Sequence, residues 1–278
     1  MQALKILIPT DFSIQSDYAY LMVKKLEERI PADIHFLHVL AVPDTVTLSP
    51  SGEIQTCGEI DVRYVEDQKS IAERKLAELR QHYGEAIHTH LVLGKITDAI
   101  IGFAATGQFD LIVMGTKGSF GLKEKFSGSE ARIVARKSPT PVLSLMCDRS
   151  DLKPDNILLV HNFDHPSAED LTLLKTISLA FGSRIHLLQI ITGKGEHNEE
   201  QVRKNMEAFA RLNGLESYDA HVLKDSDVEQ GVVHFNQQIN MDIVCIGTHG
   251  KGNIFHQSAA EKLIQHLFKP IISFHLNQ

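Results

Sequence analysis

Apolar residues along the first half of the chain recur with two different spacings. Residues 4–9 form a continuous apolar run, which is typical of a strand that is buried on both faces. Residues 14–30 instead carry apolar side chains three and four positions apart, which is the spacing of one helix face. The same reading predicts further strands at 34–40, 87–93, 111–114 and 140–145, and further helices at 65–82, 97–106 and 129–137. This alternation favours a parallel sheet with helices on both faces.

The second half of the chain repeats the first. The matching segments are 5–12 with 156–163, 34–39 with 185–190, and 109–118 with 241–250. Strands of the second half are expected near 156–160, 185–191, 218–223, 242–246 and 271–275. We therefore predict two tandem copies, at residues 1–147 and 153–278, each an α/β unit with a doubly wound, five-stranded parallel sheet. We expect the two copies to form an intramolecular pseudo-dimer by packing their fifth strands or the flanks of these strands together, and a homodimer of chains is left open.

The first copy is longer than the second between the matching segments. Residues 41–61, with two prolines and a Ser-Gly pair, read as a long excursion after the second strand. Long loops inside compact domains are often lids or interaction surfaces. A tolerated surface insertion explains the same residues equally well, so both interpretations stay open.

Composition narrows the classes of function. The chain has 278 residues, with 28 Lys and Arg against 35 Asp and Glu, which argues against a general nucleic-acid binder. Cys57, Cys147 and Cys245 form no CxxC pair, so neither a disulfide framework nor a cysteine zinc site is indicated. The sequence shows no signal-peptide pattern and no apolar stretch long enough to span a bilayer. We expect a cytoplasmic protein with no membrane or nucleic-acid partner.

Candidate binding residues gather at the ends of the first and fourth strands. The first strand ends in Pro9, Thr10 and Asp11, and a glycine-rich loop with Gly115 and Gly118 follows the fourth. If these strands are neighbours, a carboxylate and a run of backbone amides face one crevice, and amides near a helix N-terminus favour phosphate. The alternative is structural: these are turn glycines, and the Ser127 to Glu130 segment is a helix-capping box.

These residues resemble the universal stress protein family, and the resemblance extends over nearly the whole chain in two copies. The family's ATP signature has two glycines three positions apart, then nine residues, then Gly and Ser or Thr. The chain matches it with Gly115, Gly118, Gly128 and Ser129. The resemblance implies a Rossmann-like fold of the HUP type and an ATP site, in which a magnesium ion could accompany the ATP.

The resemblance also implies roles for individual residues. Asp11 would meet the ribose hydroxyls and Val39 the adenine, while Met114, Gly115 and Gly118 would line the ribose and phosphate path. Gly128 and Ser129 would hold the triphosphate. The full set expected to bind the nucleotide is Pro9, Thr10, Asp11, Val39, Met114, Gly115, Lys117, Gly118, Gly128, Ser129 and Glu130. Glu130 departs from the family's usual apolar residue, and its charge would oppose an anion.

The second copy has lost most of the signature. Asn162 stands in the place of Asp11, and Gln257 in the place of Gly128, with a loop three residues shorter. An amide accepts hydrogen bonds from ribose less strongly than a carboxylate does. The second copy is therefore not expected to bind ATP in the same way.

Other chemistry finds weaker support. The P-loop, GxGxxG and GxSxG motifs are absent. His88 and His90 share a strand face and could ligate one ion, but surface or core histidines are the favoured interpretation, so no metal site and no catalytic residue is assigned. The pairs His161 with His165 and His249 with His256 are interpreted in the same way.

The leading functional hypothesis is a nucleotide-responsive stress-response protein that binds ATP in its first copy. One alternative is a slow ATPase or autophosphorylating protein. Another is a binder of a different small ligand or a metal in the second copy.

Overall fold

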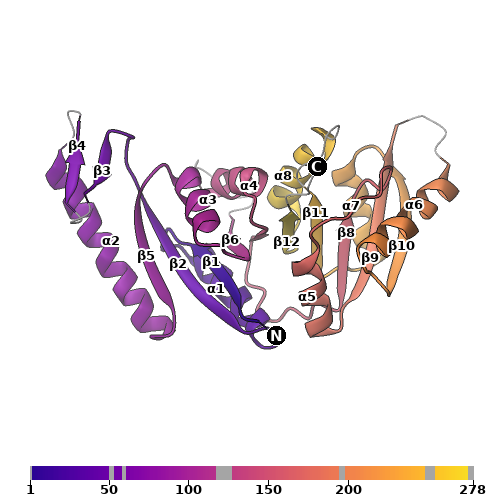
Figure 1. The fold of residues 1–278 in the computed structure, drawn as a ribbon, viewed down its shortest axis with the longest axis horizontal. Coiled ribbons are helices and arrows are strands. Elements are labelled where there is room, and N and C mark those ends of the chain that lie inside the picture. The colour runs from indigo at the N-terminus through magenta and orange to yellow at the C-terminus, as the bar shows by residue number, and fades with distance from the viewer. Residues whose placement is uncertain are drawn as a thin grey trace.

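A computed structural model describes residues 2–49, 53–57, 61–116, 127–193, 198–247 and 254–274. The described strands form a ten-stranded sheet in the order β10-β9-β8-β11-β12-β7-β6-β1-β2-β5, and the chain also has a two-stranded sheet of β3 and β4. Figure 1 shows the ten-stranded sheet running through both halves of the molecule. The α/β fold predicted from the sequence is confirmed.

The first half supplies the strands on one side of the sheet. Its strands are β1 (Leu4–Pro9), β2 (Ala32–Ala41), β3 (Val46–Leu48), β4 (Ile54–Thr56), β5 (His88–Gly94), β6 (Leu111–Gly115) and β7 (Val142–Leu145). Its helices are α1 (Ile14–Glu27), α2 (Val62–Tyr83), α3 (Ile96–Thr106) and α4 (Ser127–Lys137). Five of these strands, β1, β2, β5, β6 and β7, pair in parallel, as buried apolar runs predict.

The second half repeats the order of these elements, except that β3 and β4 have no counterpart among its described residues. Its strands are β8 (Asn156–Val160), β9 (Arg184–Thr192), β10 (Tyr218–Asp225), β11 (Ile243–Gly247) and β12 (Ile271–Phe274). Its helices are α5 (Thr172–Phe181), α6 (Glu199–Leu212), α7 (Val228–Gln238) and α8 (Ile254–His266). All five strands again pair in parallel with one another.

The two halves meet through their last strands. β7 and β12 pair in antiparallel fashion, and Leu143 faces Ile272 at the centre of the register. The Ser273 hydroxyl donates a hydrogen bond to the Val142 carbonyl at 3.2 Å across this seam. This is the contact expected between the two fifth strands. The two five-stranded parallel sheets are present as predicted, and the antiparallel pairing of β7 with β12 joins them into one sheet.

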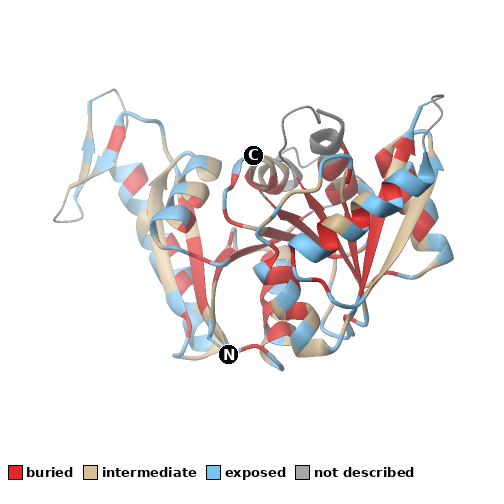
Figure 2. Ribbon diagram, turned by 45° about the vertical axis from the view of Figure 1, so that its right-hand side comes forward, coloured by how far each residue is buried: buried red, intermediate tan, exposed pale blue. Residues whose placement is uncertain are grey.

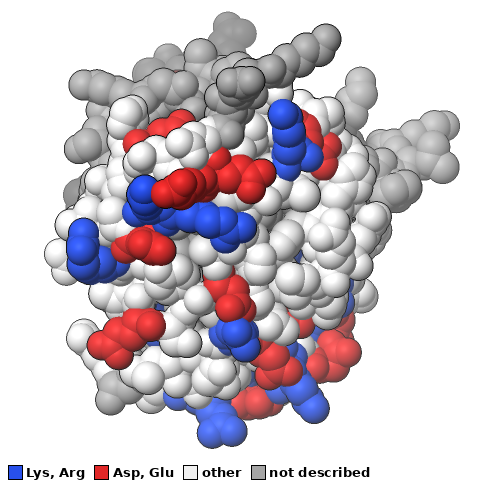
Figure 3. Space-filling view, turned by 90° about the vertical axis from the view of Figure 1, so that its right-hand side faces the viewer, with Lys and Arg blue, Asp and Glu red and all other residues white. Residues whose placement is uncertain are grey.

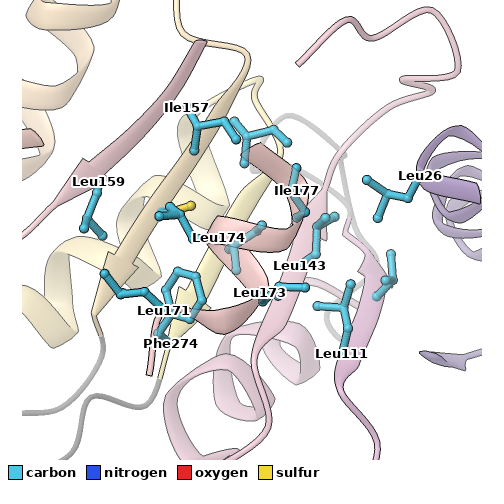
Figure 4. Close-up of a cluster of buried hydrophobic side chains, with 14 of the residues drawn as sticks. Leu26, Leu111, Leu143, Ile157, Leu159, Leu171, Leu173, Leu174, Ile177 and Phe274 are labelled. Atoms are coloured by element: carbon cyan, nitrogen blue, oxygen red, sulfur yellow. The ribbon is translucent and has the colours of Figure 1, made fainter. Parts of the chain in front are cut away.

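Helices cover both faces of the sheet. Residues of α1, α2, α5 and α6 pack on one face, and residues of α3, α4, α7 and α8 pack on the other. Figure 2 shows the central strands buried between these layers, whereas the edge strands β5 and β10 are mostly of intermediate burial. The core continues across the seam: Figure 4 places Leu111 and Leu143 of the first half beside Leu173 and Ile177 of α5.

Two sequence predictions about elements need correction. The excursion at 41–61 is more than a loop, because β3 and β4 pair in antiparallel fashion with Thr47 facing Gln55. The first helix ends at Glu27 rather than at residue 30. Ile30 is buried, but it reaches the core from a turn in which the Leu26 carbonyl accepts hydrogen bonds from both Arg29 and Ile30.

Two further features concern the hydropathy of the helices and the charge on one surface. Among the described helices, none is long and apolar enough to cross a bilayer. Figure 3 looks onto the end of the second half, where Lys and Arg side chains are interspersed with Asp and Glu.

Candidate functional site

A cavity of about 310 Å³ opens where β1, β2 and β6 end. β1 lies between β2 and β6 in the sheet, so the carboxyl ends of these neighbouring strands share one edge. Ligand crevices of open parallel sheets form at this edge. The lining residues are Pro9, Thr10, Asp11, Ser13, Gln15, Ser16, Leu37, His38, Val39, Ile96, Ile100, Met114, Gly115 and Glu130.

The cavity brings together seven of the residues proposed from sequence. They are Pro9, Thr10, Asp11, Val39, Met114, Gly115 and Glu130. Lys117 and Gly118 lie outside the described residues. Gly128 and Ser129 belong to the first turn of α4, where only the backbone is described, and the Ser127 side chain of the suggested capping box is likewise not described. His249 lies outside the described residues, as does the side chain of His256.

Local hydrogen bonds shape the turn between β1 and α1. The buried Thr10 hydroxyl donates to the Ser16 hydroxyl at 3.0 Å and accepts from the Phe12 amide at 2.9 Å. Phe12 has a φ of 62°, a left-handed conformation that is uncommon for a bulky side chain. Its ring lies 4.5 Å from that of His38. The turn is therefore fixed by side chains rather than by glycine.

Asp11 is the exposed carboxylate of the site. The Ser13 amide donates to one of its carboxylate oxygens at 3.0 Å, and the Ser13 hydroxyl donates to the same oxygen. These bonds orient Asp11 beside the cavity that it lines. A carboxylate held in this way can accept two hydrogen bonds from a vicinal diol.

Gly115 allows β6 to approach the first turn of α1 closely. A Cβ at this position would lie 1.8 Å from the Gln15 carbonyl oxygen and 2.4 Å from its carbonyl carbon. Real Cβ atoms do not make such contacts with backbone. Gly115 of the predicted nucleotide motif thus has a packing role.

Sequence reasoning missed much of the apolar wall. Ile96 and Ile100 lie one turn apart on α3 and face the cavity together with Leu37. Their spacing marks an apolar helix face, but nothing in the sequence says that this face borders a crevice. His38, which sequence reasoning also missed, precedes the predicted binding residue Val39 on β2. Its Nδ1 lies 2.8 Å from the Thr10 carbonyl oxygen. Burial lowers the pKa of His38.

Glu130 brings a second carboxyl group to the cavity from the first turn of α4. Partial burial raises the pKa of this carboxyl, because removal from water disfavours its charged form. Asp11 and Glu130 thus differ in setting: one is exposed and hydrogen-bonded, the other partly desolvated.

The second copy builds a different turn at the equivalent place. The Gln189 side chain accepts a hydrogen bond from the Phe163 amide at 3.2 Å and donates to the Asn162 side chain at 3.3 Å. Phe163 is fully buried and packs at 5.0 Å against Phe209. The Asn162 side-chain oxygen thus accepts hydrogen bonds from Gln189 of β9 and from the Asp164 amide of its own turn. Gln257 and Ser258 belong to α8, and their side chains are not described.

A second cavity of about 200 Å³ lies near the start of α7. Its lining residues are Thr192, Ser226, Asp227, Val228, Glu229, Ala259 and Lys262. Glu229 interacts with Lys262 at 3.5 Å and with His266 at 2.8 Å. The two cavities therefore differ in size and in charge.

Comparisons of the sequence with known proteins identify one family. The sequence model of the universal stress protein family matches residues 3–145. The universal stress protein MJ0531 of Methanocaldococcus jannaschii is 31% identical over 139 residues, which are 50% of this chain and 79% of that protein. A second one from this organism, MJ0577, is 27% identical over 149 residues, covering 50% of this chain and 92% of that protein.

Solved structures extend the likeness in fold to both halves. The crystal structure of a universal stress protein from Archaeoglobus fulgidus superposes with a TM-score of 0.69 at 21% identity, covering 99% of each chain. The likeness in fold thus extends over both copies. With the family match over the first half and the curated relative at 31% identity, the chain belongs to the universal stress protein family.

Proposed function

We propose that the first copy binds ATP and that the protein acts as a nucleotide-responsive module in a cytoplasmic stress response. The observation that carries this proposal is the convergence of seven candidate residues, from four separate segments, on one cavity. Its volume of about 310 Å³ falls at the lower end of the roughly 300–1,000 Å³ that is usual for small-molecule pockets.

The chemistry of the walls suits the parts of a nucleotide. Ile96, Ile100 and Val39 offer an apolar surface for a flat base. Asp11 offers an oriented carboxylate for the ribose hydroxyls. The N-terminus of α4, an eleven-residue helix, supplies backbone amides and the positive end of a dipole for phosphates.

The test uses the full-length chain. Nucleotide released from the purified protein by heat is identified by chromatography, and ATP binding with magnesium is measured by calorimetry. We expect one molecule of ATP per chain. Removal of the carboxylate in Asp11→Ala is expected to weaken binding by roughly 10- to 100-fold, since a hydrogen bond to a charged group contributes about 1.5–3 kcal/mol.

Asn162→Ala is the matched control, because Asn162 occupies the equivalent position in the second copy. It should leave ATP affinity unchanged. The proposal fails if neither released nucleotide nor binding heat is found, or if Asn162→Ala rather than Asp11→Ala abolishes binding.

A further inference from the structure

Three side chains of types that can ligate a metal converge at the amino ends of β2 and β5. The cavity described above lies at the opposite, carboxyl ends of the strands. Asp33 and His35 alternate near the start of β2 and so point to the same face, and His88, the first residue of β5, faces His35 in the register. The Asp33 carboxylate lies 3.1 Å from His35 Nε2 and 3.4 Å from His88 Nε2. One ligand atom from each residue falls within 4.8 Å of the others.

The two ring nitrogens of His35 lie in different settings. His35 is only 9% exposed. Among the described residues, its buried Nε2 has no well-aligned hydrogen-bond partner, although the Asp33 carboxylate is near. The other nitrogen, Nδ1, lies 2.9 Å from Nε2 of His90. When Nδ1–H donates to His90, the lone pair of His35 Nε2 faces an anionic carboxylate. A cation between the two groups would satisfy both.

The second copy provides an internal comparison. His186 and His221 repeat the histidine pair of the first copy, with Nδ1 and Nε2 3.1 Å apart. There His186 Nε2 has a partner, because it lies 3.1 Å from the Asn156 side-chain oxygen. The position equivalent to Asn156 in the first copy is Lys5, whose ammonium instead donates to the Gly107 carbonyl at 2.8 Å.

The charges in the two clusters are also rearranged. Arg184 stands where the first copy has Asp33, and Asp219 stands where it has His88. Arg184 forms an ion pair with Asp219, so the second copy supplies its own cation to its carboxylate. The first copy has two imidazoles and a carboxylate in these places and no guanidinium.

We propose that Asp33, His35 and His88 bind one divalent transition-metal ion, with zinc as the best match to two imidazoles and a carboxylate. Ligand atoms at about 2.0–2.1 Å from a tetrahedral zinc ion lie roughly 3.3 Å apart, close to the separations at which the Asp33 oxygens approach the two nitrogens. His90 is a positioning residue that orients His35 through its Nδ1.

The surroundings suit a cation. The Asp33 carboxylate supplies a negative charge beside both imidazoles. The Lys5 ammonium is the nearby cation, and it is held by the Gly107 carbonyl and lies over the Phe109 ring at 4.6 Å. Three protein ligands leave a fourth position for water. No sequence motif joins the set, since Asp33 and His35 lie on β2 and His88 lies on β5.

The test uses the tag-free, full-length chain, stripped with a chelator and kept free of nucleotide. Cobalt(II) is titrated while visible absorption is recorded, and zinc is then added as a competitor. We expect one equivalent of cobalt with the intense absorption of a tetrahedral site, bleached by zinc. His88→Ala and Asp33→Asn should each weaken cobalt binding at least tenfold, and His90→Ala by roughly 10–100-fold.

The second copy supplies the controls. His221→Ala and Asp219→Asn change the equivalent residues and should leave the cobalt spectrum and the affinity as in the parent chain. Circular dichroism confirms that each variant is folded; the His88 side chain is 57% exposed, so its removal should not disturb the core. The proposal is overturned if no cobalt absorption appears, if it persists in both His88→Ala and Asp33→Asn, or if His221→Ala abolishes it.

Discussion

Gly115 is the residue at which the fold and the candidate site depend on one another most directly. Because glycine has no Cβ, the backbone of Gln15 can lie against it. A Cβ at position 115 would be 1.8 Å from the Gln15 carbonyl oxygen. We expect Gly115→Ala to destabilise the protein by about 1–3 kcal/mol, because only backbone movement can relieve the clash. Thermal or urea unfolding measures this loss, and ATP binding should weaken in parallel because α1 carries part of the cavity wall.

Gly102 is a matched control for that substitution. It lies on the exposed side of α3, and a Cβ there would have no neighbour within 4 Å. Because alanine favours the helix over glycine by about 1 kcal/mol, Gly102→Ala should stabilise the protein. If both alanine variants had the same effect on the unfolding free energy, the close-approach explanation for Gly115 would be wrong.

Glu130 predicts a pH dependence with a definite sign. Burial raises the pKa of its carboxyl, so the folded state disfavours the charged form. The resulting loss of stability sets in as pH rises from the ordinary glutamate pKa through the raised value, and it is complete above that value. Glu130→Gln should therefore raise the melting temperature at pH 8, and the difference should shrink as the pH falls toward 5.

The same substitution tests the charge of the proposed ATP site. A neutral side chain at position 130 removes a repulsion, so Glu130→Gln should bind ATP more tightly than the parent chain at pH 8. Phosphate groups of ATP also titrate, so the useful quantity is the difference in affinity between the two proteins at each pH. An advantage that grew as the pH fell would contradict this account.

At the scale of elements, strand positions could be predicted because buried parallel strands are apolar runs. The end of α1 could not be predicted in this way. Ile30 continues the apolar spacing of the helix, but it lies in the turn after α1 and is buried in the core. For the cavity, the residues that end strands were found, whereas Ile96 and Ile100 were missed because their contact depends on how α3 packs. The cluster of Asp33, His35 and His88 depends on the pairing of β2 with β5, which the sequence does not specify.

The β3–β4 pair offers a prediction about the excursion. None of its described residues lines the cavity at the ends of β1, β2 and β6, and Figure 1 places this pair at one extremity of the molecule. Replacing residues 43–58 with a short Gly-Ser linker should leave ATP affinity within twofold of the parent chain. Calorimetry on the folded variant measures this. A tenfold loss would instead identify the segment as a lid, the interpretation that the sequence left open.

At the scale of the molecule, the continuous sheet depends on equivalent strands meeting about a local two-fold axis. Leu143 and Ile272 occupy equivalent positions in the two copies and face each other in the register of β7 and β12. Repetition in the sequence revealed two copies, but the antiparallel pairing of their edges is a property of the assembled sheet. Both strands are buried along their whole length and are apolar except for one serine each, Ser144 and Ser273, so the pairing also protects two edges from other chains.

The same symmetry predicts the behaviour of the first copy when it is produced alone. Residues 1–147 would keep β7 but lose β12, which leaves the hydrogen-bonding edge at Leu143 unpaired. Because an antiparallel pair centred on Leu143 can be formed by two identical strands, this fragment should form a homodimer, whereas the full chain already pairs this edge internally. Light scattering after size exclusion, over a range of concentrations, would distinguish the two states. A folded fragment that stayed monomeric at tens of micromolar would show that the helices beside the seam, rather than the strand edge, hold the two copies together.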